Sequence, residues 1–277
     1  MNKLSTKNHD RDIVGLTYVY PVISRRAGGV SLGINLNPNN KCNWQCVYCQ
    51  VPNLQRGVAP EIDLTLLTAE LDGFLGELLH GSYMEKHVPK QCQTLCDLAI
   101  SGNGEPTTCP NFEQVVSVIV GLMGKYDLSI PLRLITNGSS VHRQPVTSAL
   151  ALIKERQGEV WFKVDAIGEL MTQQINGVSL SASWQLKQLQ FAASTCPTWL
   201  QTCVLKQETE DETFTEQYLT WLKTALSQGI KIEGVLLYGL ARPSLQEGGE
   251  LLVSADDVWL KNFAQKIESC GIMAKVS

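Results

Sequence analysis

Strand-like and helix-like segments alternate along this chain of 277 residues. Short apolar runs of β type predict strands at Val30–Leu36, Asp97–Ser101, Leu132–Thr136, Val160–Val164, Leu200–Leu205 and Ile232–Tyr238. Helical periodicity predicts helices at Thr65–Leu79, Phe112–Met123, Pro145–Glu155, Ala182–Ala193, Phe214–Leu226 and Ala255–Ser269. Alternation of this kind is typical of βα units, so we expect an α/β fold with a parallel sheet and outer helices.

The length and organisation of the chain favour one domain. No low-complexity segment and no linker rich in Pro and Gly divides the sequence. A single α/β barrel is routinely of this size, and such a chain can bury about three quarters of its unfolded surface. We expect one domain over residues 1–277, with an N-terminal extension at 1–29 and a partial barrel at 30–277.

Charge and hydropathy bear on whether the protein binds nucleic acid or enters a membrane. The chain has 23 Lys and Arg against 27 Asp and Glu, and this net charge of −4 does not favour a sequence-independent grip on nucleic acid. Segment 1–15 is polar, and no apolar run approaches the roughly 20 residues that span a bilayer. We therefore expect a cytoplasmic protein without a membrane segment.

Three of the nine cysteines lie together in the stretch "CNWQCVYC", at Cys42, Cys46 and Cys49. Thiols stay reduced in the cytoplasm, so this cluster indicates metal or redox chemistry and not a disulfide framework. Structural zinc takes four ligands, and no histidine lies at finger-like spacing; catalytic zinc with an open position and three incidental cysteines remain alternatives. A [4Fe–4S] cluster usually has four thiolate ligands, so three would leave one iron open to an exogenous ligand.

Polar and glycine-rich loops follow the predicted strands, with the sequences "NPNNKCNWQCVYC", "SGNGEPT", "TNGSS", "DAIGE" and "GLARPS". In a parallel barrel the loops after the strands share one face, and that face carries the chemistry. We therefore expect these loops to converge on an active site. Plainer interpretations are ordinary turns, which Asn-Gly pairs favour, and a simple ion pair between Lys163 and Asp165.

The Cys-x3-Cys-x2-Cys spacing, with Tyr48 directly before the third cysteine, resembles the radical S-adenosylmethionine superfamily. The resemblance implies a partial (β/α)6 barrel. It implies one [4Fe–4S] cluster ligated by Cys42, Cys46 and Cys49, with S-adenosylmethionine bound at the open iron. Given an electron donor such as flavodoxin or ferredoxin, S-adenosylmethionine would be cleaved to a 5′-deoxyadenosyl radical that abstracts a hydrogen atom from an unidentified substrate.

The loop "SGNGEPT" resembles the Gly-Gly-Glu motif of that superfamily and contains Gly102, Asn103, Gly104 and Glu105. Glycines permit close approach of the strand end to the methionine part of the cofactor. An ionised Glu105 can accept charge-assisted hydrogen bonds from its ammonium group. The plain alternative is a turn between a strand and a helix.

The resemblance also assigns residues around the remainder of the cofactor. It places Tyr48 near the adenine, and Thr136 and Asn137 near the ribose and carboxylate of S-adenosylmethionine. The candidates for catalysis or substrate binding are Lys163, Asp165, Cys203 and Arg242. We expect Arg242 to bind a carboxylate of the substrate or cofactor, with a surface salt bridge as the alternative.

A narrower resemblance is to the tricyclic wyosine-base synthases of tRNA, and it is carried by "SRRAGGVSLGINLNPNNKCNWQCVYCQ", "SGNGEPT", "KVDA", "LQTCVL" and "GLARPS". Those enzymes carry further N-terminal cysteines for a second cluster, whereas none precedes Cys42 in this sequence. The net acidity of the chain and the lack of an appended RNA-binding domain favour a small molecule or a peptide as the substrate. Modification of a tRNA base and a non-catalytic zinc-binding module are the alternatives.

The other cysteines are expected to form no second cluster. Cys92 and Cys96 precede the second predicted strand and Cys109 follows it, so a strand about 16 Å long separates them. This group also includes Cys196 and Cys270. Most of these cysteines are expected to be buried as small apolar side chains. The orientation of Cys203 in the fifth strand is left open.

Overall fold

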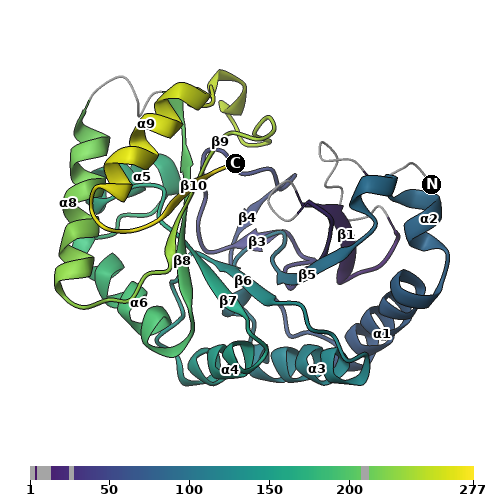
Figure 1. Ribbon diagram of the computed structural model, residues 1–277. Coiled ribbons are helices and arrows are strands. Elements are labelled where there is room, and N and C mark those ends of the chain that lie inside the picture. Colours follow the sequence, from purple (N-terminus) through teal and green to yellow (C-terminus); the bar gives the residue numbers. More distant parts are fainter. Residues whose placement is uncertain (1–3, 5–13, 25–27, 207–211) are drawn as a thin grey trace.

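The computed structural model describes residue 4 and residues 14–24, 28–206 and 212–277. An eight-stranded sheet runs through it in the order β1-β2-β5-β6-β7-β8-β9-β10. Its strands are β1 (Val19–Ile23), β2 (Val30–Ile34), β5 (Leu95–Ile100), β6 (Leu132–Thr136), β7 (Glu159–Lys163), β8 (Thr198–Val204), β9 (Gly234–Gly239) and β10 (Ala274–Val276). All neighbouring strands are parallel except β1 and β2. A parallel sheet of this length curls into a partial barrel, as Figure 1 shows.

Helices form an outer layer that follows the curve of the sheet, from α1 through α3 and α4 to α8 and α9 (Figure 1). The helices are α1 (Leu64–His80), α2 (Tyr83–His87), α3 (Phe112–Lys125), α4 (Gln144–Glu155), α5 (Gly168–Asn176), α6 (Ala182–Thr195), α8 (Thr213–Ser227) and α9 (Asp257–Glu268). Short 3-10 helices lie at Lys90–Cys92, Pro106–Thr108 and Gly249–Leu251. The main hydrophobic core lies between this layer and the outward face of the sheet, because both contribute its buried apolar side chains.

The inward face of the sheet surrounds a cavity and is more polar than the outward face. Successive side chains of a strand point to opposite faces. In β8, Leu200 and Val204 belong to the hydrophobic core, whereas Gln201 and Cys203 line the cavity. The strand pattern therefore separates a packed exterior from an interior that can hold a ligand.

The predicted fold class is confirmed. The six predicted strands correspond to β2 and β5 to β9, and the predicted helices correspond to α1, α3, α4, α6, α8 and α9. The N-terminal extension contributes β1, which pairs with β2 and places the ring of Tyr20 over Gly33. A Cβ at Gly33 would lie 2.2 Å from that ring, so the pairing requires glycine there. Part of the extension is thus a strand of the main sheet.

A small second sheet supports the cysteine loop. Its strands, β3 (Lys41–Cys42) and β4 (Gln55–Arg56), are parallel, and the backbone N–H of Gly57 donates to the carbonyl of Cys42 at 2.9 Å. Both ends of the loop are thereby held together. In the part of the chain that the structure describes, no helix is both long and apolar enough to cross a membrane.

Candidate active site

A cavity of about 800 Å³ opens at the carboxyl ends of the parallel strands and extends into the partial barrel. Its volume lies within the range of roughly 300–1,000 Å³ that is usual for ligand pockets. The sequence-predicted residues that line it are Cys42, Cys46, Tyr48, Cys49, Gly102, Asn103, Gly104, Glu105, Thr136, Asn137, Lys163, Cys203 and Arg242. Asp165 lies behind this wall and is 1% exposed. The loops after the strands therefore converge, as the predicted topology requires.

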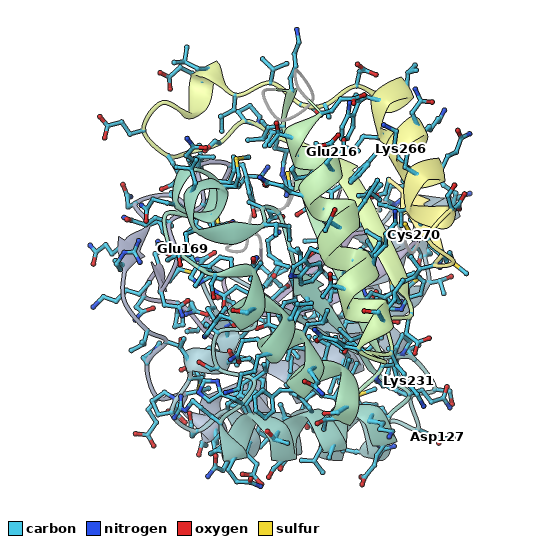
Figure 2. The ribbon with its side chains drawn as sticks, turned by 90° about the vertical axis from the view of Figure 1, so that its left-hand side faces the viewer. Asp127, Glu169, Glu216, Lys231, Lys266 and Cys270 are labelled. Carbon is cyan, nitrogen blue, oxygen red and sulfur yellow. The ribbon has the colours of Figure 1, made fainter. Side chains whose placement is uncertain are left out.

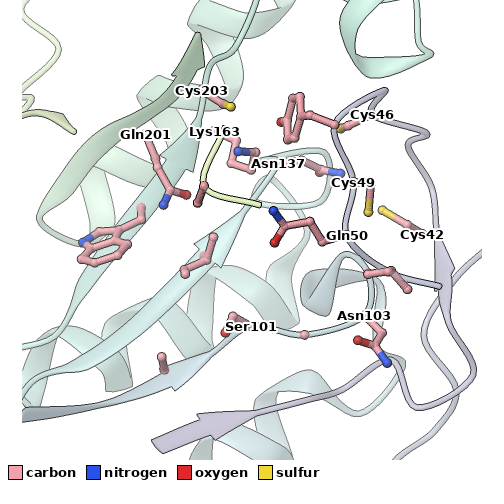
Figure 3. Close-up of a pocket in the computed structure, with 18 of the residues that line it drawn as sticks. Cys42, Cys46, Cys49, Gln50, Ser101, Asn103, Asn137, Lys163, Gln201 and Cys203 are labelled. Carbon is pink, nitrogen blue, oxygen red and sulfur yellow. The ribbon is translucent and has the colours of Figure 1, made fainter. Parts of the chain in front are cut away.

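The three clustered cysteines lie on one side of the cavity mouth. Figure 3 shows the sulfurs of Cys42 and Cys49 turned toward one another, with Cys46 farther along the same loop. The end of α5 holds this loop, since the carbonyls of Ile175 and Asn176 accept backbone hydrogen bonds from it at 2.9 and 3.0 Å. The sulfurs are therefore presented by a backbone that is fixed on both sides.

The electrostatics of these thiols suit ligands of a cationic centre. The pKa of Cys42 is raised to about 12 and that of Cys46 to about 11, mainly by burial, with smaller contributions from nearby carboxylates and from the neighbouring thiols. Metal binding requires thiolates, and a cation would remove their mutual repulsion. No three His, Cys, Asp or Glu side chains among the described residues are placed to hold a single metal ion. Three thiols at one cavity match a cluster that has three protein ligands and one open iron.

Glu105 joins the ends of β5 and β6 inside the site. It is 3% exposed, and its Oε1 accepts hydrogen bonds from Thr107 N at 3.1 Å, Thr107 Oγ1 at 2.5 Å and Thr136 Oγ1 at 2.6 Å. Its Oε2 accepts from Asn137 N at 2.6 Å. Burial raises the pKa of Glu105, and these four hydrogen bonds oppose the increase. Oε2 keeps acceptor capacity for a further donor, such as an ammonium group of a ligand.

The glycines of this loop allow the segment before Cys42 to approach closely. A Cβ at Gly102 would lie 2.1 Å from Asn35 Oδ1, and one at Gly104 would lie 2.1 Å from the carbonyl oxygen of Lys41. Asn35 Oδ1 also accepts the backbone N–H of Asn103 at 3.0 Å. The "GNG" stretch is thus required by packing against the cysteine loop, whether or not it also contacts a ligand.

Asp165 is the centre of a buried network that reaches the cysteine loop. Its Oδ2 accepts hydrogen bonds from the hydroxyl of Tyr48 and, at 3.2 Å, from Asn176 Nδ2. The same Asn176 amide donates to Cys46 Sγ at 3.3 Å. Asp165 Oδ1 accepts the backbone N–H of Cys203 at 3.0 Å. The carboxylate of Asp165 therefore connects Tyr48 and, through Asn176, Cys46 to strand β8.

Lys163 forms the ion pair that its spacing from Asp165 indicates. Its Nζ lies 3.2 Å from Asp165 Oδ1 and donates to the hydroxyl of Tyr238 at 2.9 Å. Burial alone would lower the pKa of Lys163, but Asp165, Tyr238 and Cys203 together outweigh it and the pKa is raised. The ammonium group therefore stays charged and remains part of the cavity wall.

Replacing Tyr48 by Phe should reduce the stability of the fold. The change removes a hydrogen bond to the carboxylate of Asp165, and bonds to charged groups contribute about 1.5–3 kcal/mol. We expect the free energy of unfolding in urea to fall by about that amount. Tyr83→Phe is the matched control, because Tyr83 is a buried residue whose hydroxyl has no hydrogen-bond partner among the described residues. Equal losses in both variants would contradict the assigned bond.

Arg242 lies at the cavity mouth, where it is joined to a residue that the sequence analysis did not single out. Its Nε donates to Gln50 Oε1 at 2.8 Å, and Gln50 Nε2 donates to the carbonyl of Arg242 at 3.0 Å. Gln50 follows the third cysteine of the cluster directly. This reciprocal pair connects the cysteine loop to the segment after β9. Carboxylate binding by Arg242 stays a prediction.

The remaining cysteines are spread over the structure. Cys109 and Cys196 are buried in the core. Cys270 follows α9 and lies on the other side of the view from Glu169 in Figure 2. Of the cysteines outside the clustered three, Cys203 lines the cavity in the described structure. Its orientation, which the sequence left open, is therefore inward.

Sequence comparisons identify partial relatives. No protein-family model matches the chain. A UPF0026 protein of Methanocaldococcus jannaschii is 31% identical over 156 residues, which cover 56% of this chain and 42% of that protein. The GTPase Obg of Brachyspira hyodysenteriae is 28% identical over 152 residues, covering 54% of this chain and 19% of that protein. The chain therefore matches less than half the length of each of these relatives.

Solved structures with the same fold are radical S-adenosylmethionine enzymes. A radical SAM methyltransferase from Sphaerobacter thermophilus has a TM-score of 0.65 at 13% identity, covering 94% of this chain and 68% of that chain. A TYW1 structure with a lysine-pyruvate adduct bound has a TM-score of 0.56 at 12% identity, covering 86% and 73%. The chain has the fold of radical S-adenosylmethionine enzymes, and the resemblance predicted from its sequence is confirmed at that level.

Proposed function

We propose that this protein is a radical S-adenosylmethionine enzyme that abstracts a hydrogen atom from a small-molecule or peptide substrate. The observation that carries the proposal is the placement of three thiols and a buried carboxylate around one cavity of this fold. Bound [4Fe–4S] cluster and S-adenosylmethionine would together supply a 5′-deoxyadenosyl radical once an electron is provided. An external donor such as flavodoxin or ferredoxin would provide that electron.

The residues of the chain would bind and orient these groups. Cys42, Cys46 and Cys49 would ligate one cluster, and Glu105 would accept hydrogen bonds from the ammonium group of S-adenosylmethionine. Thr136 and Asn137, which are buried at the end of β6, would line its ribose and carboxylate. The remaining cofactor contacts would come from the residues named in the sequence analysis, namely Tyr48, Gly102, Asn103 and Gly104.

The shape of the cavity supports a compact substrate. The cavity continues from the cysteine loop to inward side chains of the barrel strands, so a small molecule or an extended side chain could reach the interior. A structural neighbour with a TM-score of 0.56 and 15% identity, covering 89% of this chain and 62% of its own, has AdoMet and a Cp18Cys peptide bound. The TYW1 neighbour keeps modification of a tRNA base as the second candidate.

Formation of 5′-deoxyadenosine tests the proposed chemistry. Protein whose cluster has been reconstituted anaerobically should convert S-adenosylmethionine to 5′-deoxyadenosine and methionine when dithionite is added. Products are measured by liquid chromatography and mass spectrometry after a long incubation, because turnover without substrate can be slow. A sample without dithionite is the control. No 5′-deoxyadenosine from protein with a full, reduced cluster would contradict the proposal.

A zinc-binding module without catalytic activity would give a different spectrum. Iron and sulfide would be absent, and the d¹⁰ zinc ion would give no visible absorption. Metal analysis of anaerobically purified protein, combined with its absorption spectrum, therefore separates this alternative from the enzyme.

A further inference from the structure

Gln201 places a side-chain amide in the cavity wall. It lies on β8 two residues before Cys203, deeper in the barrel, and Figure 3 shows its amide pointing into the cavity. The residue is 5% exposed. Its backbone belongs to the sheet, but among the described residues its side chain has no hydrogen-bond partner. The amide faces the cavity and is suited to pairing with a ligand there.

The charges around this amide favour a neutral ligand. On β7 its cross-strand neighbour is Lys163, whose ammonium group lies 3.2 Å from Asp165. Deeper in the barrel, Arg133 contacts Asp97 and lies 2.7 Å from Glu159. Both cations are thus compensated by carboxylates. A charged ligand group beside the amide would lose its hydration without gaining a free counter-charge, so its binding would be unfavourable.

The amide itself selects the hydrogen-bonding groups of the ligand. Its Nε2 donates and its Oε1 accepts. A carboxylate would satisfy only the donor, and an ammonium group only the acceptor. A carboxamide, lactam or imide has a donor and an acceptor side by side and satisfies both. The rings of Trp161 and Tyr238 line the same cavity, and Arg133 and Lys163 lie 5.1 and 5.5 Å from their respective centroids.

We propose that Gln201 is a substrate-recognition residue, and that the part of the substrate entering the barrel is a neutral amide, lactam or imide. That this ligand is the substrate of the enzyme rests on the proposed function. Binding of the amide group itself requires neither a cluster nor a reductant.

Small probes test the subsite on the purified full-length chain. The probes are 2-pyridone and succinimide, each compared with its N-methyl derivative, which lacks the donor. Calorimetry or ligand-observed NMR should show binding to the wild type, and binding at least about fivefold weaker for the N-methyl compounds. Gln201→Leu should weaken the binding of 2-pyridone and succinimide by a similar factor.

Gln217→Leu is the matched control, because it makes the same change at an exposed position of α8 and should bind the probes as the wild type does. Melting temperature checks the fold, and Gln201→Met is used if the leucine variant does not fold. Absence of binding to the wild type, equal binding by both glutamine variants, or preference for propionate over the amides would overturn the proposal. Formation of 5′-deoxyadenosine is assayed separately on reconstituted wild-type protein, so its failure would contradict the radical chemistry and not the amide subsite.

Discussion

Replacing Cys42, Cys46 and Cys49 together by Ala is expected to abolish cluster binding. The three thiols line one side of the cavity, and the pKa values of Cys42 and Cys46 are both affected by the neighbouring thiols. After anaerobic reconstitution we expect about four irons per wild-type chain and almost none per variant chain. Iron and sulfide analysis measures the loss, together with disappearance of the visible absorption.

The control for this experiment is the double variant Cys92→Ala, Cys96→Ala. These two thiols are partly buried near the start of β5 and do not line the cavity. The control should therefore retain the iron content of the wild type. If the triple variant retained about four irons, the assignment of a single cluster to these three cysteines would be refuted. A second cluster, as in the wyosine-base synthases, would then be the better interpretation. Melting temperatures of both variants show whether a loss of iron reflects unfolding.

The barrel could be predicted from the sequence because its signals are local. Each barrel strand is a short apolar run, and β6 has the bounds that the pattern predicts, Leu132–Thr136. The parallel order then places the ends of the strands on one rim. This is why Glu105 and Asn137, separated by 32 positions in the sequence, could be assigned to one site, and Glu105 does accept the backbone N–H of Asn137.

Elements that depend on tertiary contacts were not predicted. β1 contains Pro21, which argues against a central strand, but β1 pairs only with β2 and so tolerates it at the edge of the sheet. β10 is too short for a pattern to emerge. Gln201 also escaped notice, although a glutamine inside a predicted strand is a signal that one face of the strand is polar. That signal has meaning only once the interior of the barrel is known to hold a cavity.

Glu105→Ala is expected to damage both the fold and the binding of S-adenosylmethionine. Glu105 accepts four hydrogen bonds in a buried position, and its removal leaves the N–H groups of Thr107 and Asn137 without an acceptor. Each buried group left unsatisfied costs about 1–3 kcal/mol, so the free energy of unfolding should fall by at least about 2 kcal/mol. Loss of a charge-assisted bond to the ligand should weaken binding roughly tenfold or more.

Glu105→Gln separates these two effects. The amide has the shape of the carboxyl group and its carbonyl can still accept from Thr107 and Thr136, so urea unfolding should show a smaller loss than for Ala. The negative charge is gone, so calorimetry on the clustered protein should still show binding of S-adenosylmethionine weakened roughly tenfold. Glu155→Ala, at an exposed position in α4, should change neither quantity. Affinity equal to that of the wild type in a folded Glu105→Gln variant would remove Glu105 from the cofactor site and leave it as the tie between β5 and β6.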